Sequence, residues 1–156
     1  MHIEIRQVTP GEAPIELLLD ADPSREKLNA YVPRSHCFIA CAGDETVGAC
    51  VLQPHTRELY ELMSIAVAPA YQRQGIGEVM LRHAIDAARM LGARRIEVGT
   101  GSFGYQLTFY QKAGFRVCAI ERDFFVKNYP EPIYENGIHL KDMLRLAIEF
   151  DPPPTP

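Results

Sequence analysis

The sequence predicts an α/β protein of the α+β type, with a mixed, mostly antiparallel central sheet of about seven strands and helices on both faces. Several short runs alternate apolar and polar residues, which is the period of a β-strand. In the first half of the chain these runs follow one another directly, and in the second half they alternate with helix-like runs. A regular series of parallel βαβ units is therefore not expected.

The expected order is strand, two helices, three strands, helix, strand, helix and two strands. The strands are predicted at 3–8, 37–42, 47–52, 57–69, 94–101, 115–120 and 138–150. The helices are predicted at 11–20, from Asp22 onward, at 75–91 and at 103–114.

Local signals support the early elements. Asp22 is a candidate N-cap, because Pro23 then takes the first helical position and Glu26 lies in the first turn. Two apolar runs on either side of 43–45 predict a hairpin. The strand at 57–69 is apolar almost throughout its second half, so it is expected to be buried on both faces.

The later elements are bounded by glycines. The helix at 75–91 carries most of its apolar residues on one face and is stopped by Gly92. The helix at 103–114 ends at Gly114. The segment 121–137 holds two prolines and many aromatic residues, and it is expected to be a long loop.

The composition suits a single domain at 1–150 followed by a disordered tail at 151–156. Of the 156 residues 47% are hydrophobic, which is enough for a core. No apolar run approaches the ~18 residues of a membrane span, so no membrane partner is expected. The N-terminus lacks the regions of a signal peptide, which predicts a cytoplasmic protein.

Charge and metal-binding residues argue against several functions. The net charge is −4 and there is no run of Lys and Arg, so nucleic acid is not expected as a partner. The five histidines lack metal-ligand spacing, and no metal is expected. No CxxC pair occurs, and buried reduced thiols are expected at the four cysteines, Cys37, Cys41, Cys50 and Cys118.

Two glycines stand where an apolar strand is followed by a helix. Helix N-termini present unpaired N–H groups, and glycine lets an anion approach them closely. No acidic residue lies between Gln72 and Gly77, and Arg73 adds positive charge. The segment is therefore predicted to bind phosphate through the N–H groups of Arg73, Gln74, Gly75, Ile76 and Gly77. The alternative is a tight turn that only starts a helix.

A second glycine pattern, GTGSFG at 99–104, has the GxGxxG form of dinucleotide-binding folds, with Glu121 about 20 residues beyond it. Such a fold should carry this motif near its start, with several βα units after it. Only about 35 residues follow Glu121, without a further convincing helix, so this interpretation is set aside.

Two motifs together resemble one known family. QxxGxG at 72–77, preceded by AVAPAY, resembles the acetyl-CoA-binding motif of the GCN5-related N-acetyltransferase (GNAT) family. TFYQKAGF at 108–115 resembles that family's second signature, LYxKxGF. The element order also matches over about residues 3–148. The resemblance implies the GNAT acyl-CoA N-acyltransferase fold and an enzyme that moves the acetyl group of acetyl-CoA, its co-substrate, to a primary amine.

The resemblance also implies a coenzyme site. Its residues here would be Ile65, Ala66, Val67, Ala68, Gln72, Arg73, Gln74, Gly75, Ile76, Gly77, Glu78, Ser102, Tyr110 and Lys112. The backbone of 66–68 would pair with the pantetheine arm, and the glycines of 99–104 would open a strand end for it. Many relatives bind the arm with an asparagine after the fifth strand; none stands here, and Ser102 is the candidate replacement. Lys112 would contact phosphate or be a solvated helix charge.

Two catalytic roles follow from the same resemblance. Glu61 precedes Val67 by six residues, where family members with a glutamate base carry theirs, so it would deprotonate the amine. Its alternative is an exposed strand carboxylate. Tyr110 matches the tyrosine that protonates the departing thiolate in many members, and its alternative is a tyrosine packed on the sheet.

The acceptor is expected between the early helices and the late loop. That loop combines aromatic residues with carboxylates, which suits a cationic amine. They are Phe124, Phe125, Tyr129, Tyr134, Glu121, Asp123, Glu131 and Glu135. Alternatively, the loop only packs on its own aromatics. The expected reaction is direct attack by a small-molecule amine in a ternary complex; acetylation of a protein N-terminus or lysine and a non-catalytic acyl-CoA sensor are the alternatives. A homodimer is compatible with the family.

Overall fold

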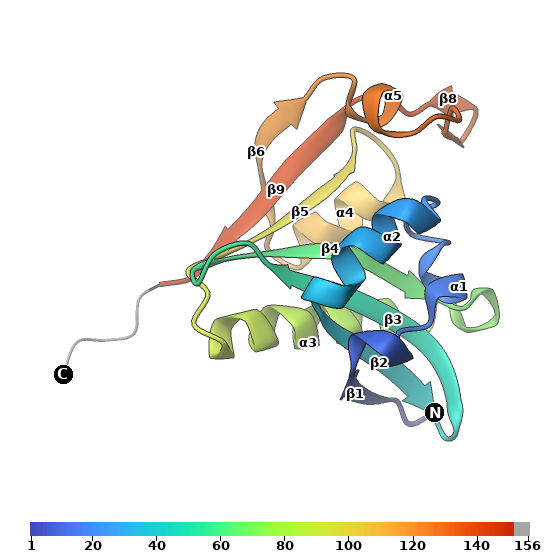
Figure 1. Cartoon of the computed structure of the whole chain (residues 1–156), viewed down its shortest axis with the longest axis vertical. Helices are drawn as coiled ribbons and strands as arrows, with labels where there is room; N and C mark the ends of the chain where they lie inside the picture. The colour runs from blue at the N-terminus through green and yellow to red at the C-terminus, as the bar shows by residue number, and fades with distance from the viewer. Residues whose placement is uncertain (152–156) are drawn as a thin grey trace. The chain divides into compact units, whose positions relative to one another are not determined.

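The computed structural model describes residues 1–151, and the expected tail beyond Asp151 lies outside the described residues. The chain forms two compact units, one of Met1–Ile96 with the chain from Phe150, the other of Glu97–Glu149. The first contains β1 (Glu4–Val8), η1 (Pro10–Glu12), α1 (Ile15–Leu18), α2 (Arg25–Tyr31), η2 (Val32–Arg34), β2 (His36–Ala42), β3 (Glu45–Pro54), β4 (Leu59–Val67), η3 (Pro69–Tyr71), α3 (Ile76–Met90) and the start of β5 (Arg95–Gly101), where η marks a 3-10 helix (Figure 1).

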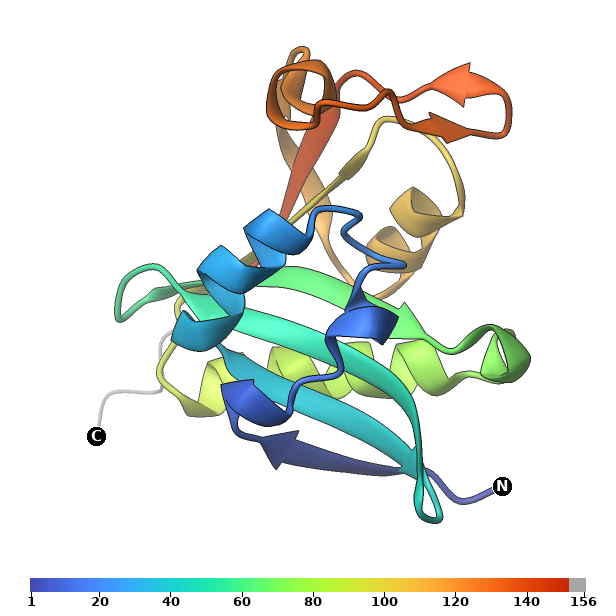
Figure 2. The same cartoon turned by 45° about the vertical axis from the view of Figure 1, so that its right-hand side comes forward.

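Strands β1 to β4 form an antiparallel meander with helices on both of its faces. Each strand pairs with the next one in the chain. Figure 2 shows α1 and α2 on one face of this meander and α3 on the other. Leu28 of α2 is buried in a cluster with Val51 of β3, whereas Met80 of α3 is buried in a cluster with Ala40 of β2. The strands of the first unit thus separate two apolar layers.

The second unit carries the rest of β5 and the remaining elements. They are α4 (Tyr105–Lys112), β6 (Arg116–Glu121), α5 (Phe124–Asn128), β7 (Tyr134–Glu135), β8 (Ile138–His139) and β9 (Met143–Glu149). β6 pairs antiparallel with β9, and β7 and β8 form a separate hairpin. Phe115 and Leu146 are fully buried. Nη2 of Arg145 donates to Oε1 of Glu97 at 3.0 Å.

The strand order confirms the predicted fold class. The order is β1-β2-β3-β4-β5 in the first unit and β5-β9-β6 in the second. Strand β5 appears in both because the boundary between the units, after Ile96, falls within it. These are the strands of a seven-stranded sheet, and every pairing described above is antiparallel. The expected α+β architecture is therefore correct. No helix among the described residues is long and apolar enough to cross a membrane.

The start of the second helix was expected at the wrong residue. Ser24, not Asp22, is the N-cap of α2, and its Oγ accepts a hydrogen bond from the N–H of Lys27 at 3.1 Å. Asp22 is buried and accepts hydrogen bonds from the N–H of Ser24 and the hydroxyl of Tyr31. Both residues are good caps by type, and the tertiary bond to Tyr31 decides between them.

The expected loop at 121–137 is in part wrong, because it contains α5 and β7. The helix has five residues, too few for a periodic pattern, and follows Asp123 at a φ of 60°. The hairpin of β7 and β8 turns at Asn136 and Gly137, with φ of 53° and 77°. Asn-Gly between short strands is a strong hairpin signal that the sequence did contain. Accordingly β9 begins at Met143 instead of 138.

Burial corrects two more expectations. Cys37, Cys41 and Cys50 are buried free thiols as predicted, but Cys118 is exposed. It lies on β6, all six residues of which are exposed. β4 is not buried on both faces: Ile65 and Val67, for example, remain half-buried among fully buried neighbours.

Candidate functional site

Helix α3 starts without a side-chain cap. Its N-cap is Gly75, which has a φ of 83° and no cap hydrogen bond from a side chain. The first helical hydrogen bond runs from the N–H of Val79 to the carbonyl of Gly75 at 3.1 Å. The N–H groups of Ile76, Gly77 and Glu78 therefore have no partner within the helix. Together with the positive end of the helix dipole they form an anion-binding surface.

The backbone before α3 is bent in a way that keeps this surface open. Arg73 has a φ of 64°, which is uncommon for a residue with a side chain and costs of order 1–3 kcal/mol. A Cβ on Gly75 would meet no heavy atom of the described residues within 4 Å, so none of them packs there. A phosphate could approach the main chain at this point, and the residues present fit the diphosphate of a coenzyme.

Side chains fix the segment between β4 and α3. Nε2 of Gln72 donates to the carbonyl of Val67 at 3.0 Å, and the hydroxyl of Tyr71 donates to Oε2 of Glu45 at 2.5 Å. The hydrogen bond to Glu45 raises the pKa of Tyr71. Gln72 thus has a structural partner here, in addition to the coenzyme role that the resemblance implied for it.

The end of β4 offers backbone groups on alternate residues. The N–H of Ala68 donates to the carbonyl of Val47 on β3 at 2.8 Å. In an antiparallel strand the N–H and C=O groups of successive residues point to opposite sides. Ala66 therefore also points its backbone toward β3, whereas Ile65 and Val67 point theirs away from it. Of the expected pantetheine-pairing positions 66–68, Val67 is therefore the one whose backbone points away from β3, and Ile65 points its backbone the same way.

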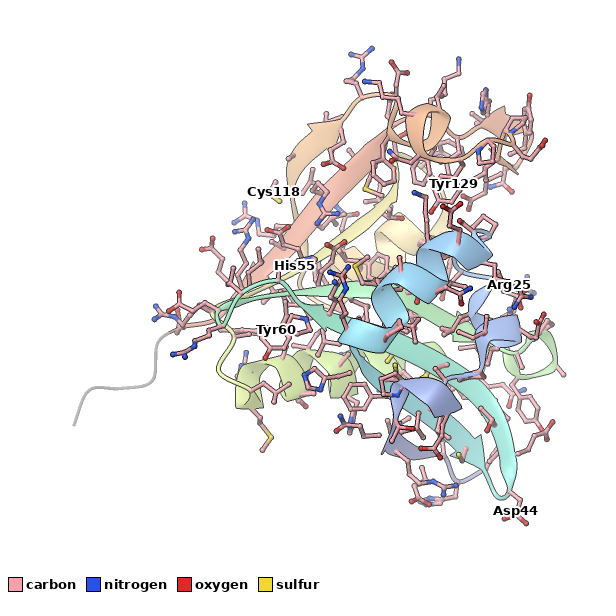
Figure 3. The ribbon with its side chains drawn as sticks, in the orientation of Figure 1. Arg25, Asp44, His55, Tyr60, Cys118 and Tyr129 are labelled. Carbon is pink, nitrogen blue, oxygen red and sulfur yellow. The ribbon has the colours of Figure 1, made fainter. Side chains whose placement is uncertain are left out.

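Glu61 lies in the first half of β4, beside a histidine. Its Oε1 is 2.7 Å from Nε2 of His55. His55, labelled in Figure 3, follows β3. The Glu61 side chain is 14% exposed and that of His55 is 35% exposed. The carboxylate is thus more buried than the exposed strand residue of the alternative interpretation, and a donor holds it in place.

A β-bulge in β4 places the side chains of Glu61 and Ser64 on the same face of the strand. On β3 Gln53 pairs with Glu61 and Val51 pairs with Ser64, and the register shifts between these pairs. Met63 is the extra residue on β4. Because residues 51 and 53 of β3 share a face, Glu61 and Ser64 share it too, although they are three positions apart. Val51 belongs to the cluster containing residues of α1 and α2, so this is the face that those helices cover.

The second unit contains the other expected site residues, and the two sets belong to different units. Tyr110 is buried on α4, with its ring edge-on to Phe115 at a centroid distance of 5.8 Å. Lys112, the last residue of α4, is exposed. Ser102 follows β5 and is exposed. Tyr110 therefore packs against Phe115, and its catalytic role stays a proposal.

The glycines of GTGSFG make room for neighbouring side chains. A Cβ on Gly99 would lie 2.5 Å from Sδ of Met143, and one on Gly101 would lie 2.5 Å from Leu140. Gly104 has a φ of 101° and faces the carboxylate of Glu135 in the same way. These contacts lie within the second unit, and at Gly104 the positive φ also favours glycine. A strand end opened for the coenzyme arm stays a prediction.

The aromatic residues of the late segment pack on one another. Phe124 is edge-on to Phe125, and Phe125 stacks on Tyr129, the residue labelled in Figure 3. Tyr134 stacks on His139 across the hairpin. This arrangement favours the alternative of a self-packed segment for Phe125 and Tyr129. Tyr134 is 63% exposed and could still meet a ligand.

His55 and Ser64 are the residues that sequence reasoning missed. His55 is a lone histidine, and only the pairing of β3 with β4 brings it to Glu61. Ser64 sits in an apolar run, and only the bulge turns it to the face of Glu61. Among the described residues no group of three or more His, Cys, Asp or Glu could hold a metal ion.

Comparisons with known proteins find similar sequences over nearly the whole chain. Residues 33–117 match the model of an acetyltransferase (GNAT) domain. The uncharacterized N-acetyltransferase YvbK of Bacillus subtilis is 43% identical over 151 residues, which are 96% of this chain and 97% of YvbK.

Two solved structures are similar over nearly their full length. A GNAT family acetyltransferase from Elizabethkingia anophelis with acetyl-CoA bound has a TM-score of 0.91 and 41% identity, covering 95% of this chain and 98% of its own. The IAA acetyltransferase from Bacillus cereus has a TM-score of 0.92 and 42% identity, covering 96% and 100%.

Proposed function

Because this chain belongs to the GCN5-related N-acetyltransferase (GNAT) family, we propose that it acetylates the primary amine of a small molecule, by direct attack on acetyl-CoA in a ternary complex. Its activity as an N-acetyltransferase follows from the family. What we propose beyond the family is the class of acceptor, the direct attack in a ternary complex, and the residues that bind the coenzyme and transfer protons. The observation that carries it is the uncapped start of α3, where Arg73 and Gly75 both have positive φ.

The coenzyme is proposed to bind along β4 and the start of α3. Its diphosphate accepts hydrogen bonds from the N–H groups of Arg73 to Glu78, and Arg73 adds charge. The pantetheine arm then runs back along β4 and pairs with the backbone of Val67 and Ile65. Bound acetyl-CoA supplies an activated acyl group, and a backbone N–H near the carbonyl stabilises the developing oxyanion, which can be worth ~10²–10³ in rate.

Glu61 is proposed as the base. An alkylamine with a pKa near ~10.4 is almost entirely protonated at neutral pH and cannot attack in that form. Glu61, held by His55, accepts one ammonium proton directly or through water. The freed lone pair forms the N–C bond as the C–S bond breaks, and Tyr110 gives its hydroxyl proton to the departing thiolate. The nitrogen then loses its second proton to water, and Tyr110 takes a proton back from solvent.

The small-molecule acceptor is supported by charge and by the exposed aromatic residues of the second unit. The net charge of −4 favours a cation over an acidic partner. Tyr134 is exposed on the β7–β8 hairpin, so its ring is available to a cation.

An acceptor panel tests the proposal. Release of free thiol from acetyl-CoA is measured with polyamines, amino sugars, aminoglycosides, IAA, and peptides with a free N-terminus or lysine, and products are identified by mass spectrometry. An acetylated small amine is expected. Transfer only to peptides would support the protein acceptor instead. Tight acetyl-CoA binding without turnover on any acceptor would support a sensor.

A further inference from the structure

Ser64 carries a buried hydroxyl that the described residues leave without a hydrogen-bond partner. The residue is 6% exposed, and its Oγ has no partner among the described residues. Its register partner Val51 and its same-face neighbours Met63 and Ala66 are apolar. A buried hydroxyl without a partner is unfavourable, and in native proteins such a group calls for an explanation. A bound molecule that forms a hydrogen bond with the Ser64 hydroxyl would explain it.

The position of Ser64 relative to Glu61 suggests what that molecule is. The bulge at Met63 puts both polar side chains on the face covered by α1 and α2. At about 3.3 Å per strand residue they stand roughly 7–10 Å apart along β4, enough for a small group between them. Glu61 lies toward the start of the strand, and Ser64 lies next to Ile65, where the coenzyme arm is proposed to end.

We infer that Ser64 is an acceptor-binding residue, whose hydroxyl oxygen accepts a hydrogen bond from the attacking amine while Glu61 takes the amine's proton. This inference rests on the proposed function. A neutral oxygen suits the task, because it binds the ammonium and the free amine alike. A second carboxylate would instead stabilise the ammonium and raise its pKa, which opposes attack. Ser64 thus orients the nitrogen without adding charge.

The test compares Ser64→Ala and Ser64→Cys with the wild type on an amine that the wild type acetylates. Both variants remove a good hydrogen-bond acceptor, and cysteine keeps a γ atom in place. Both are expected to lower kcat/KM for the amine about tenfold, with the KM for acetyl-CoA unchanged. The loss should be the same at every pH, because Ser64 moves no proton.

Stability and a matched control separate this role from a structural one. Ser64→Ala removes an unsatisfied buried group, so its melting temperature should equal or exceed that of the wild type. Cys37→Ala deletes a buried γ atom from the same face, on β2, and should keep the kinetics of the wild type.

Three outcomes decide the matter. A selective loss of amine kcat/KM in both Ser64 variants supports the inference. An active wild type with unchanged kinetics in Ser64→Ala overturns it and leaves the proposed function standing, since the hydroxyl would then be an unsatisfied group or bind only water. A wild type without turnover on any amine overturns the proposed function and this inference together.

Discussion

The Nε2 atom of His55 lies 2.7 Å from Oε1 of Glu61, and this contact joins the chain that follows β3 to the first half of β4. A neutral histidine protonated on Nε2 donates a hydrogen bond to the carboxylate, and a protonated histidine forms an ion pair with it. In both states the contact restricts the Glu61 rotamer. Because the His55 side chain is one-third exposed, we expect the contact to contribute little to the stability of the fold and mainly to position the Glu61 carboxylate.

Replacing His55 should therefore reduce turnover without affecting coenzyme binding. His55→Ala is expected to lower kcat about tenfold, because a misplaced base loses most of its advantage. The KM for acetyl-CoA should stay the same, since the start of α3 follows the other end of β4. His36→Ala is the matched control, because His36 stacks on Tyr60 beside Glu61 but does not contact the carboxylate in that stack. Equal rates in the two variants would argue against positioning.

Glu61→Gln should lose activity in a pH-dependent way. The amide keeps the shape of the side chain but accepts no proton, and at pH 7 only a few molecules in ~10⁴ of an alkylamine are free. Turnover should fall by about 10²–10⁴ at pH 7, and the deficit should shrink as the pH approaches ~10 and the amine deprotonates by itself. A pH–rate profile of both proteins checks this. A deficit of constant size across the range would exclude the role of base.

The sequence predicted the features whose signal lies in a local residue pattern. It missed the contacts that depend on how the strands pair. The glycines at 75 and 77 and the helix after them could be recognised because the signal lies within a few residues. Glu61 was found through the motif that follows it. His55 and Ser64 could not be found, because their proximity to Glu61 depends on the β3–β4 register and on one extra residue in the strand. The start of α2 was misplaced for a similar reason, a contact between Asp22 and Tyr31 nine positions away.

The thiols should react very differently. Burial raises the pKa of Cys50 to about 12 and also raises the pKa of Cys37, whereas Cys118 is exposed on β6. An alkylating reagent at pH 8 should add to Cys118 alone in the native protein and to all four cysteines after unfolding, as counted by mass spectrometry. Because native Cys50 keeps a proton that the unfolded chain loses above pH ~9, stability should also decline from there toward pH 12. Rapid native labelling of Cys50 would contradict its burial.

Tyr110→Phe tests the proposed proton donor. The ring packs edge-on against Phe115, and phenylalanine preserves this contact, so the melting temperature should change little. If the hydroxyl protonates the thiolate, kcat should fall about 10²-fold while the dissociation constant for acetyl-CoA stays within a few-fold of the wild type. Phe115→Leu is the control, since it disturbs the same packing but keeps the hydroxyl. A larger loss of kcat in the control would assign Tyr110 a packing role only.

Gly77→Asp and Gly77→Asn separate charge from size at the start of α3. Gly77 is the second residue of the helix, where a carboxylate interacts favourably with the helix dipole, so Asp should maintain or raise stability. The same carboxylate would repel a bound diphosphate. Acetyl-CoA binding, measured by calorimetry at low salt, should weaken at least tenfold more in the Asp variant than in the Asn variant. If both variants bind the coenzyme equally well, the N–H groups of this turn do not hold its phosphates, and the anion-binding role of Gly75 and Gly77 is wrong.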